Sequence, residues 1–206
     1  MQHANQRSPW EKMYESKRET DFSWFQFYPK TSVDLIKDLH LDLHSKIIDI
    51  GGGDSHLVDA LLDLGYTHIY VLDISEKTIE RAKVKLGEKS RLVNWIISDV
   101  TEFKSAVQFD LWYDRAAFHF LTDKASADQY CAIAKKIIRD RGHLIIGTFS
   151  EKGPDKCSGL EIKKYSDITL EAVFKNGFEK IRCLEENHIT PFHTNQSFTY
   201  CVFTRK

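Results

Sequence analysis

The sequence predicts an α/β fold, a doubly wound sheet with helices on both of its faces. The first observation is a series of apolar, β-rich runs: KIIDI (46–50), HIYVLD (68–73), RLVNWIISD (91–99), FDLWYD (109–114) and HLIIGTF (143–149). Nearly continuous Ile, Val and Leu indicate strands that are buried on both faces of a parallel sheet. The second observation is that helical patterns separate these runs. Strand–helix alternation with right-handed crossovers produces a doubly wound sheet.

Four segments have the periodicity and the end signals of helices. Three of these segments are preceded by a serine that can accept a hydrogen bond from the first backbone N–H groups of a helix. The same three are followed by a glycine, which readily adopts the positive φ that often ends an α-helix. These pairs are Ser55 with Gly65, Ser75 with Gly87, and Ser166 (or the adjacent Asp167) with Gly177. The fourth helix is expected over residues 124–138, where apolar side chains recur at helical spacing.

The two ends of the chain depart from this alternation. Residues 178–189 and 197–206 are more mixed runs and predict an antiparallel pair at one edge, which completes a sheet of seven strands. Residues 1–31 concentrate aromatic side chains in a short charged stretch: Trp10, Tyr14, Phe22, Trp24, Phe25, Phe27 and Tyr28. We therefore divide the chain into an N-terminal cap (1–31) and a single domain (32–206). The cap is expected to be either a helix that patches the end of the sheet or a lid over the active site.

Composition narrows the classes of partner. Lys and Arg number 29 against 30 Asp and Glu, whereas nucleic-acid binders usually carry a basic excess. No apolar run approaches the roughly 18 residues of a membrane span, and the N-terminus lacks the apolar core of a secretory signal, so we expect a cytoplasmic protein. Four dispersed cysteines without a CxxC pair predict free thiols and no metal site: Cys131, Cys157, Cys183 and Cys201.

The run KIIDIGGGDSHL joins a buried strand to a helix through a glycine turn. In an open α/β sheet, ligands bind at the carboxyl ends of the strands, where this turn is expected to lie. A dinucleotide fingerprint, G-x-G-x-x-G/A, aligned on Gly51 and Gly53 would place His56 at its third position, where the side chain would push the helix away from the strand. The chain also contains no P-loop motif.

Two aspartates follow the next two strands. Asp73 ends the second strand about 20 residues after the glycine turn, where a carboxylate can accept hydrogen bonds from both ribose hydroxyls. Asp99 ends the third strand. Ile74 and Val100 come directly after these aspartates and are placed to sandwich an adenine ring. The order and spacing predict a ligand of the adenosine type.

Asp49, Gly51 and Gly53 form a D-x-G-x-G pattern, and with the two later aspartates this segment resembles the class I S-adenosylmethionine-dependent methyltransferases. The resemblance covers residues 32–150 and implies a Rossmann-like fold with S-adenosylmethionine as cofactor and S-adenosylhomocysteine as product. It also implies a cofactor site made of Trp24, Asp49, Gly51, Gly53, Asp73, Ile74, Asp99, Val100 and Asp114, with Asp99 against the adenine amine.

The segment after the fourth strand bears on the acceptor. Its YDRAA stretch (113–117) is similar to the thiopurine-type small-molecule methyltransferases, which also have tryptophan-containing N-terminal segments. Elongation-factor and citrate-synthase lysine methyltransferases have a related W…Y start, but carry D-K-G-T in place of residues 114–117. We therefore expect in-line methyl transfer to a small soluble acceptor. The alternatives are a protein lysine methyltransferase and a catalytically silent, cofactor-binding partner protein, while a dinucleotide oxidoreductase ranks last.

Three residues of this segment are candidates for catalysis. Asp114 is expected to orient the cofactor's amino group or to act as a base, and Arg115 to hold an anionic substrate or to pair with Asp114. His119 has a suitable free pKa for a base, although its AAFHFL context is typical of a half-buried structural histidine. Further substrate contacts are expected from His193, Asn195 and Gln196.

Overall fold

The computed structural model describes residues 7–16 and 18–206. The helices are α1 (Arg7–Ser16), α2 (Lys30–Lys37), α3 (Leu57–Asp63), α4 (Glu76–Leu86), α5 (Lys124–Ile137) and α6 (Asp167–Phe174). The strands are β1 (Lys46–Ile50), β2 (His68–Asp73), β3 (Val93–Ile97), β4 (Phe109–Arg115), β5 (Ile138–Phe149), β6 (Lys156–Cys157), β7 (Leu160–Glu161), β8 (Phe178–Ile189) and β9 (Asn195–Arg205). Short 3₁₀ turns are η2 (Glu19–Asp21), η3 (Gly87–Leu92) and η4 (Phe118–Phe120).

The main sheet has seven strands in the order β3-β2-β1-β4-β5-β9-β8. Strands β1 to β5 are parallel, while β9 runs antiparallel to both β5 and β8. The strand order reverses at β1, so the carboxyl ends of β1, β2 and β4 meet at the switch point where α/β proteins bind ligands. The predicted Rossmann-like sheet, with its antiparallel pair at one edge, is confirmed.

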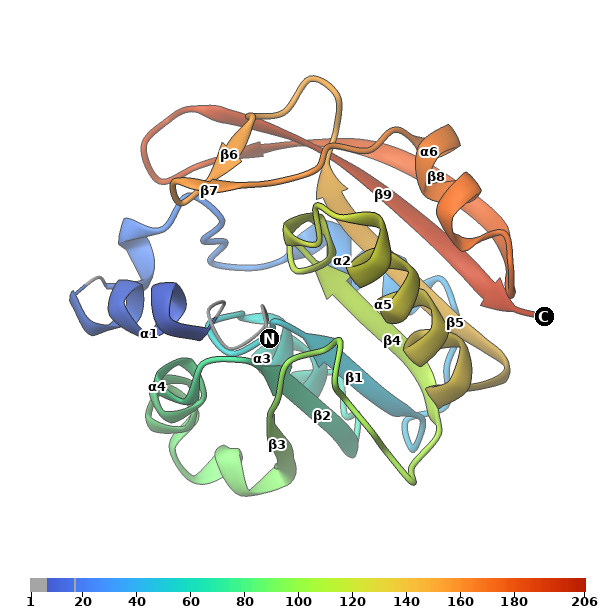
Figure 1. The fold of residues 1–206 in the computed structure, drawn as a ribbon. Coiled ribbons are helices and arrows are strands. Elements are labelled where there is room, and N and C mark those ends of the chain that lie inside the picture. The colour runs from blue at the N-terminus through green and yellow to red at the C-terminus, as the bar shows by residue number, and fades with distance from the viewer. Residues whose placement is uncertain (1–6, 17) are drawn as a thin grey trace.

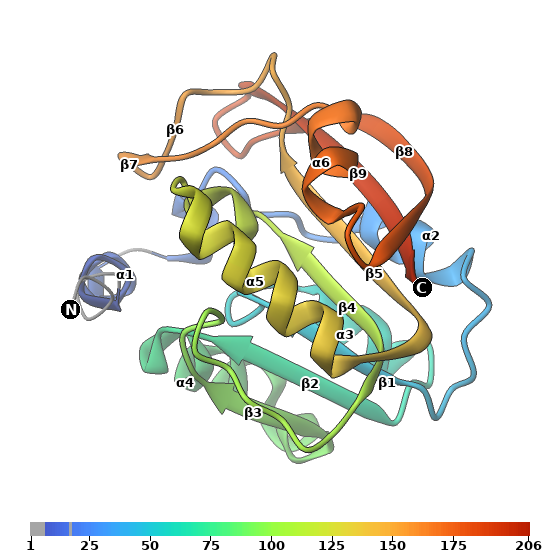
Figure 2. The ribbon, with the colours of Figure 1, turned by 45° about the vertical axis from the view of Figure 1, so that its right-hand side comes forward.

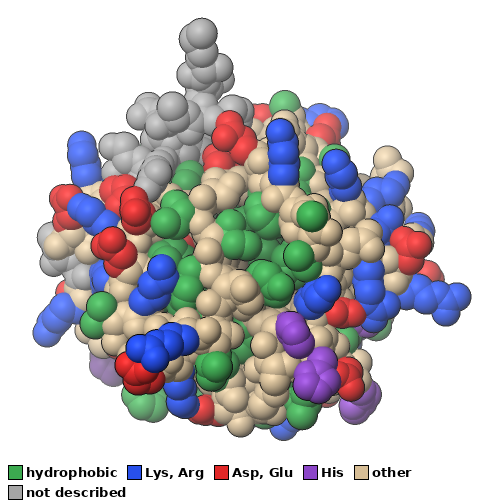
Figure 3. Space-filling view, turned by 90° about the horizontal axis from the view of Figure 1, so that it is seen from below, with side chains coloured by type: hydrophobic (Ala, Val, Ile, Leu, Met, Phe, Trp, Pro, Cys, Tyr) green, Lys and Arg blue, Asp and Glu red, His purple; other side chains and the backbone are tan. Residues whose placement is uncertain are grey.

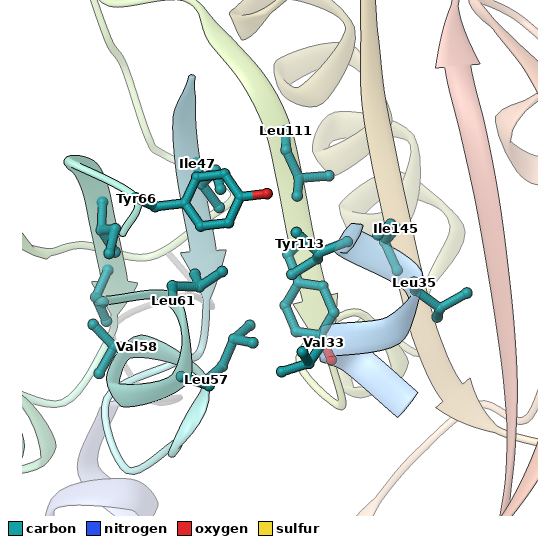
Figure 4. Close-up of a cluster of buried hydrophobic side chains, with 14 of the residues drawn as sticks. Val33, Leu35, Ile47, Leu57, Val58, Leu61, Tyr66, Leu111, Tyr113 and Ile145 are labelled. Atoms are coloured by element: carbon teal, nitrogen blue, oxygen red, sulfur yellow. The ribbon is translucent and has the colours of Figure 1, made fainter. Parts of the chain in front are cut away.

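Helices cover both faces of the sheet, as predicted: α2 and α3 lie on one face, and α5 and α6 on the other (Figures 1 and 2). Each face has its own cluster of buried side chains. Figure 4 shows the first cluster, in which Val33 and Leu35 of α2 and Leu57 of α3 pack toward Leu111 and Tyr113 of β4. Because side chains alternate along a strand, residues 111, 113 and 115 of β4 share this face, and residue 114 points to the α5 face.

The predicted helix signals hold at two of the three serine–glycine pairs. Ser75 accepts a hydrogen bond from the Thr78 N–H, and α4 is followed by Gly87 at φ 56°. Ser166 caps α6 in the same way. At the third pair, α3 begins after His56, and the Ser55 hydroxyl accepts a hydrogen bond from the Leu57 N–H at 2.9 Å. Helix α2, at the junction between cap and domain, was not expected from the sequence.

The prediction of four free thiols was wrong for two of them. Cys183 and Cys201 lie directly opposite each other in the β8–β9 ladder and form a disulfide. Cys131 and Cys157 are free. The spacing of 18 residues gave no indication of a pair, because the register of the hairpin is what brings the two side chains together.

On the face seen from below, basic and acidic side chains are interspersed around a central group of apolar ones (Figure 3). This mixture matches the formal net charge of −1. Among the described residues, no helix has the length and apolar character needed to cross a membrane.

Candidate active site

The glycine turn after β1 leaves backbone exposed to a ligand. Gly51 has φ +68°, and a Cβ there would lie 3.0 Å from the Cβ of Ala117. A Cβ on Gly53 would lie 2.8 Å from the Asp73 carboxylate. Only glycine adopts the first conformation without strain and allows the second close approach. The turn therefore packs tightly against the segment after β4 and against the end of β2, and it keeps its open side toward the pocket.

Asp73 is fixed by the turn that it packs against. The N–H groups of Gly53 and Ser75 donate to its two carboxylate oxygens at 3.1 and 2.8 Å. Burial raises the pKa of Asp73 to about 6, although these hydrogen bonds oppose the rise. A carboxylate has about four acceptor sites, so the side chain can still accept from two hydroxyls of a ligand.

Two other carboxylates of the site have an oxygen without a protein partner. Asp49 is buried, and its Oδ2 has no hydrogen-bond partner among the described residues. Burial raises the pKa of Asp49 well above its usual range, and the nearby Asp114 and Asp73 raise it further. Asp99 accepts from the backbone and hydroxyl of Thr101 through Oδ1, while its buried Oδ2 also lacks a partner in the part of the chain described. Each free oxygen is an acceptor that a ligand N–H group can satisfy.

One pocket brings most of the predicted site residues together. Its lining includes Trp24, Asp49, Gly51, Asp73, Ile74, Asp99, Val100 and Arg115. Gly53 does not line the pocket itself, but its N–H fixes Asp73. The carboxylates come from β1, the turn after it (Asp54), β2 and the loop after β3, whereas Arg115 enters from β4. The pocket is thus acidic at one end and cationic at the other.

Arg115 is held on three sides at the β4 end. Its Nε donates to the Tyr200 hydroxyl at 2.9 Å, and its Nη1 donates to the Trp24 carbonyl at 3.0 Å. The guanidinium carbon lies 4.7 Å from the centre of the Phe198 ring. The remaining nitrogen, Nη2, is buried without a hydrogen-bond partner among the described residues.

The family model for a methyltransferase domain matches residues 41–196, which is most of the chain and includes the whole glycine turn. The protein belongs to this methyltransferase family. S-Adenosylmethionine is therefore its cofactor, and the resemblance of the glycine turn and strand-end aspartates to class I enzymes is confirmed.

Individual relatives agree with this family. The mouse eEF1A lysine and N-terminal methyltransferase (Mus musculus) is 29% identical over 121 residues, which is 58% of this chain and 16% of that protein. Nodulation protein S of Rhizobium fredii is 27% identical over 78 residues, 38% of this chain and 44% of the relative. The chain thus spans less than half the length of these two relatives.

A solved structure reproduces the fold over nearly the full length. The N-methyltransferase NodS from Bradyrhizobium japonicum WM9, solved with S-adenosylhomocysteine, superimposes with a TM-score of 0.72 at 16% identity, covering 95% of this chain and 97% of that one. At this identity the likeness shows a shared fold.

The site residues of this methyltransferase fit the chemistry of its cofactor. Asp73 has acceptor sites suited to ribose hydroxyls, the free oxygen of Asp99 is suited to the adenine amine, and that of Asp49 is suited to the cationic amine of the methionine part. A group of desolvated carboxylates favours a cationic ligand, because a nearby positive charge stabilises their ionised form. The cofactor supplies a methyl group activated by a sulfonium.

Asp114 and His119 lie away from the pocket lining. Asp114 is fully buried on the α5 face, where it accepts from the Tyr130 hydroxyl at 2.6 Å and from the N–H groups of Ala117 and Phe118. His119 is also fully buried, and its Nδ1 accepts from the Phe149 N–H at 3.3 Å. Burial lowers the pKa of His119 to about 3, and the charge on Arg115 lowers it further. We propose that both residues brace the β4–α5 connection instead of moving protons.

The cap contributes more to the pocket than the sequence indicated. Trp10 and Tyr14 of α1 line the pocket together with Trp24. The Trp10 ring packs edge-on against the ring of Phe120, which also lines the pocket, and the two ring centres lie 4.9 Å apart. Tyr28, another aromatic residue of the cap, is exposed and does not line the pocket. Contacts between α1 and the rest of the site depend on tertiary packing, which the local sequence pattern does not specify.

Sequence reasoning also missed a polar pair at the β4 end of the pocket. Ser32 of α2 and Tyr113 of β4 both line it, and their hydroxyl oxygens lie 2.5 Å apart. The alternation along β4 was the available signal, because it puts residues 113 and 115 on the same face. Of the residues suggested as substrate contacts near the C-terminus, His193 and Asn195 are exposed, Gln196 is buried, and none of the three lines the pocket.

Proposed function

We propose that this methyltransferase transfers its methyl group to a small acceptor that carries an anionic or strongly polar group, with Arg115 holding that group. The supporting observation is the free Nη2 of Arg115, a buried donor in the pocket wall. A buried donor without a partner costs about 1–3 kcal/mol, which a bound anion would recover. The planar guanidinium also orients such a group.

The reaction is an in-line displacement at the methyl carbon. When bound, the cofactor would supply a methyl group activated by its sulfonium, and S-adenosylhomocysteine would be the second product. The main tasks of the protein are alignment of the reacting atoms and exclusion of water. In this proposal Asp49, Asp73 and Asp99 align the cofactor, and Arg115 aligns the acceptor. The aromatic side chains of the cap exclude water.

A second candidate function is methylation of lysine or of an N-terminal amine in a protein. The observation in its favour is the similarity to the eEF1A lysine and N-terminal methyltransferase. A cationic lysine chain would be repelled by Arg115 at the β4 end of the pocket, which favours the small acceptor. The cytoplasmic location expected from the N-terminus stays a prediction.

The two candidates differ in where label from the cofactor goes. A lysate from cells lacking the protein is incubated with the purified enzyme and cofactor labelled in its methyl group, and small molecules are then separated from proteins. We expect label in the small-molecule fraction, and less of it with the Arg115→Ala variant. Label on one protein band, at lysine or at an N-terminus, would replace the first proposal with the second.

A further inference from the structure

Arg115 is useful for recognising an anion only if its guanidinium keeps one orientation. The flexible stem of an arginine does not provide this by itself. Among the described residues no carboxylate forms an ion pair with Arg115 within 4.0 Å. Its direct contacts are with neutral partners, namely a phenol hydroxyl, a backbone carbonyl and an aromatic ring, and the charge of Glu186 acts on it without forming an ion pair.

Tyr200 reaches Arg115 because of a glycine on the neighbouring strand. Gly147 of β5 lies opposite Tyr200 of β9, and next to Arg115 in the β4–β5 ladder. A Cβ on Gly147 would lie 2.5 Å from the tyrosine ring, so the missing side chain is the space that the ring fills. The ring is fully buried, and its hydroxyl lies 2.9 Å from the arginine Nε. Tyr200 thus extends from the C-terminal strand across β5 to the β4 end of the pocket.

The Trp24 carbonyl, the second partner of Arg115, is held in place by β8. His188 is buried, and its Nε2 donates to the carbonyl of Ser23, the residue before Trp24, at 2.7 Å. Thr31 donates to Glu186 of the same strand at 2.7 Å. These contacts attach the second half of the cap to the edge of the sheet, so the carbonyl that faces Nη1 is part of a fixed wall.

We infer that Tyr200 is a positioning residue, which fixes the Arg115 guanidinium so that Nη2, its nitrogen without a protein partner, is the donor left for the acceptor and selects a group with an anionic oxygen or sulfur. This inference rests on the proposed function of Arg115. Tyr200 and the Trp24 carbonyl occupy Nε and Nη1, and the Phe198 ring covers one face of the guanidinium. An acceptor then binds a donor whose direction is already set, which reduces the entropy lost on binding.

The test uses benzoate as the anionic probe and benzamide as its neutral counterpart of the same shape. Both are titrated by calorimetry into the full-length protein saturated with S-adenosylhomocysteine. We expect the wild type to bind benzoate about tenfold more tightly than benzamide, since a hydrogen bond to a charged group is stronger than a neutral one. In Tyr200→Phe the preference should fall to about twofold, with unchanged affinity for benzamide and for S-adenosylhomocysteine.

Tyr66→Phe is the matched control, because Tyr66, like Tyr200, is a buried tyrosine outside the pocket lining, but no hydrogen bond joins it to Arg115 among the described residues. It should keep the full preference for benzoate. If Tyr200→Phe also keeps it, the inference is refuted and the proposed function stands. If the wild type itself shows no preference for the anion, the proposed role of Arg115 fails, and the role of Tyr200 fails with it.

A second measurement needs no substitution at Tyr200. In the wild type, nitrogen-15 spectra of the arginine side chains should show a protected Nε–H signal for Arg115, assigned by its loss in Arg115→Lys, and separate signals for its two terminal nitrogens. Averaged terminal signals at low temperature would mean a freely rotating guanidinium and would refute the inference even if Tyr200→Phe does not fold.

Discussion

Lowering the pH from 7 to 5 should weaken cofactor binding through Asp73. The carboxylate must be ionised to accept hydrogen bonds from both ribose hydroxyls, and its pKa in the free protein is raised to about 6 by burial. At pH 7 most molecules already carry the ionised form. At pH 5 the group is one pKa unit below its midpoint, and ionising it costs about 1.4 kcal/mol, or about tenfold in affinity. Asp49, whose pKa is also raised, acts in the same direction.

The assay is calorimetric titration of S-adenosylhomocysteine at pH 5, 6 and 7 and constant ionic strength, in buffers of different ionisation enthalpy. The dissociation constant should rise about tenfold or more between pH 7 and pH 5, and binding at pH 6 should release about half a proton from Asp73. Asp73→Asn should bind at least tenfold more weakly at pH 7 and lose the proton release at pH 6, while the pH dependence that Asp49 contributes remains. A dissociation constant that does not change with pH, or a proton release at pH 6 that is the same in Asp73→Asn as in the wild type, would refute the assignment of Asp73 to the ribose.

Three other predictions follow from particular contacts. Gly51→Ala should lower the free energy of unfolding by about 1–3 kcal/mol and weaken cofactor binding, because alanine is strained at the φ of +68° that this turn requires. Denaturant titration measures the change in stability, and calorimetry measures the change in binding. Removing the chain up to the end of α1 should speed dissociation of S-adenosylhomocysteine in stopped flow, and an unchanged rate would contradict the covering role of α1. Reducing the disulfide, or replacing Cys183 and Cys201 by alanine, should lower the free energy of unfolding by about 3 kcal/mol, because the disulfide closes a loop of 18 residues.

The core of the proposed cofactor site was predictable because it follows from strand order. A buried strand that ends in a glycine turn, and two later strands that end in aspartates, must bring those ends together once the sheet is parallel. The structure brings Asp49, Asp73 and Asp99 into one pocket in this way. The strands themselves were also predicted well. β1, β2 and β8 have the expected bounds, and β5 differs chiefly in beginning earlier, at Ile138.

The acceptor end could not be predicted to the same extent, because it depends on which face each side chain of β4 takes. One of the two roles expected for Arg115 was a pairing with its neighbour Asp114, yet the alternation of the strand sends the two side chains to opposite faces. Asp114 joins Tyr130 in the core of the α5 face, and Arg115 meets the cap and Tyr200. Tyr200, a partner of Arg115, lies 85 residues away from it in sequence and comes close because β9 pairs antiparallel with β5.

The distribution of charge in the pocket bears on the order of binding. Four carboxylates, Asp49, Asp54, Asp73 and Asp99, line one end, and Arg115 stands at the other. The charge of Arg115 partly offsets the rise in the pKa of Asp49, so the two ends of the pocket influence each other in the free protein.

An anionic acceptor that enters a pocket without cofactor is repelled by the carboxylates, whereas the cationic cofactor is attracted to them. Once the cofactor's positive charge offsets the carboxylates, Arg115 is the dominant charge that the acceptor meets. The electrostatics therefore favour binding of the cofactor first and the acceptor second.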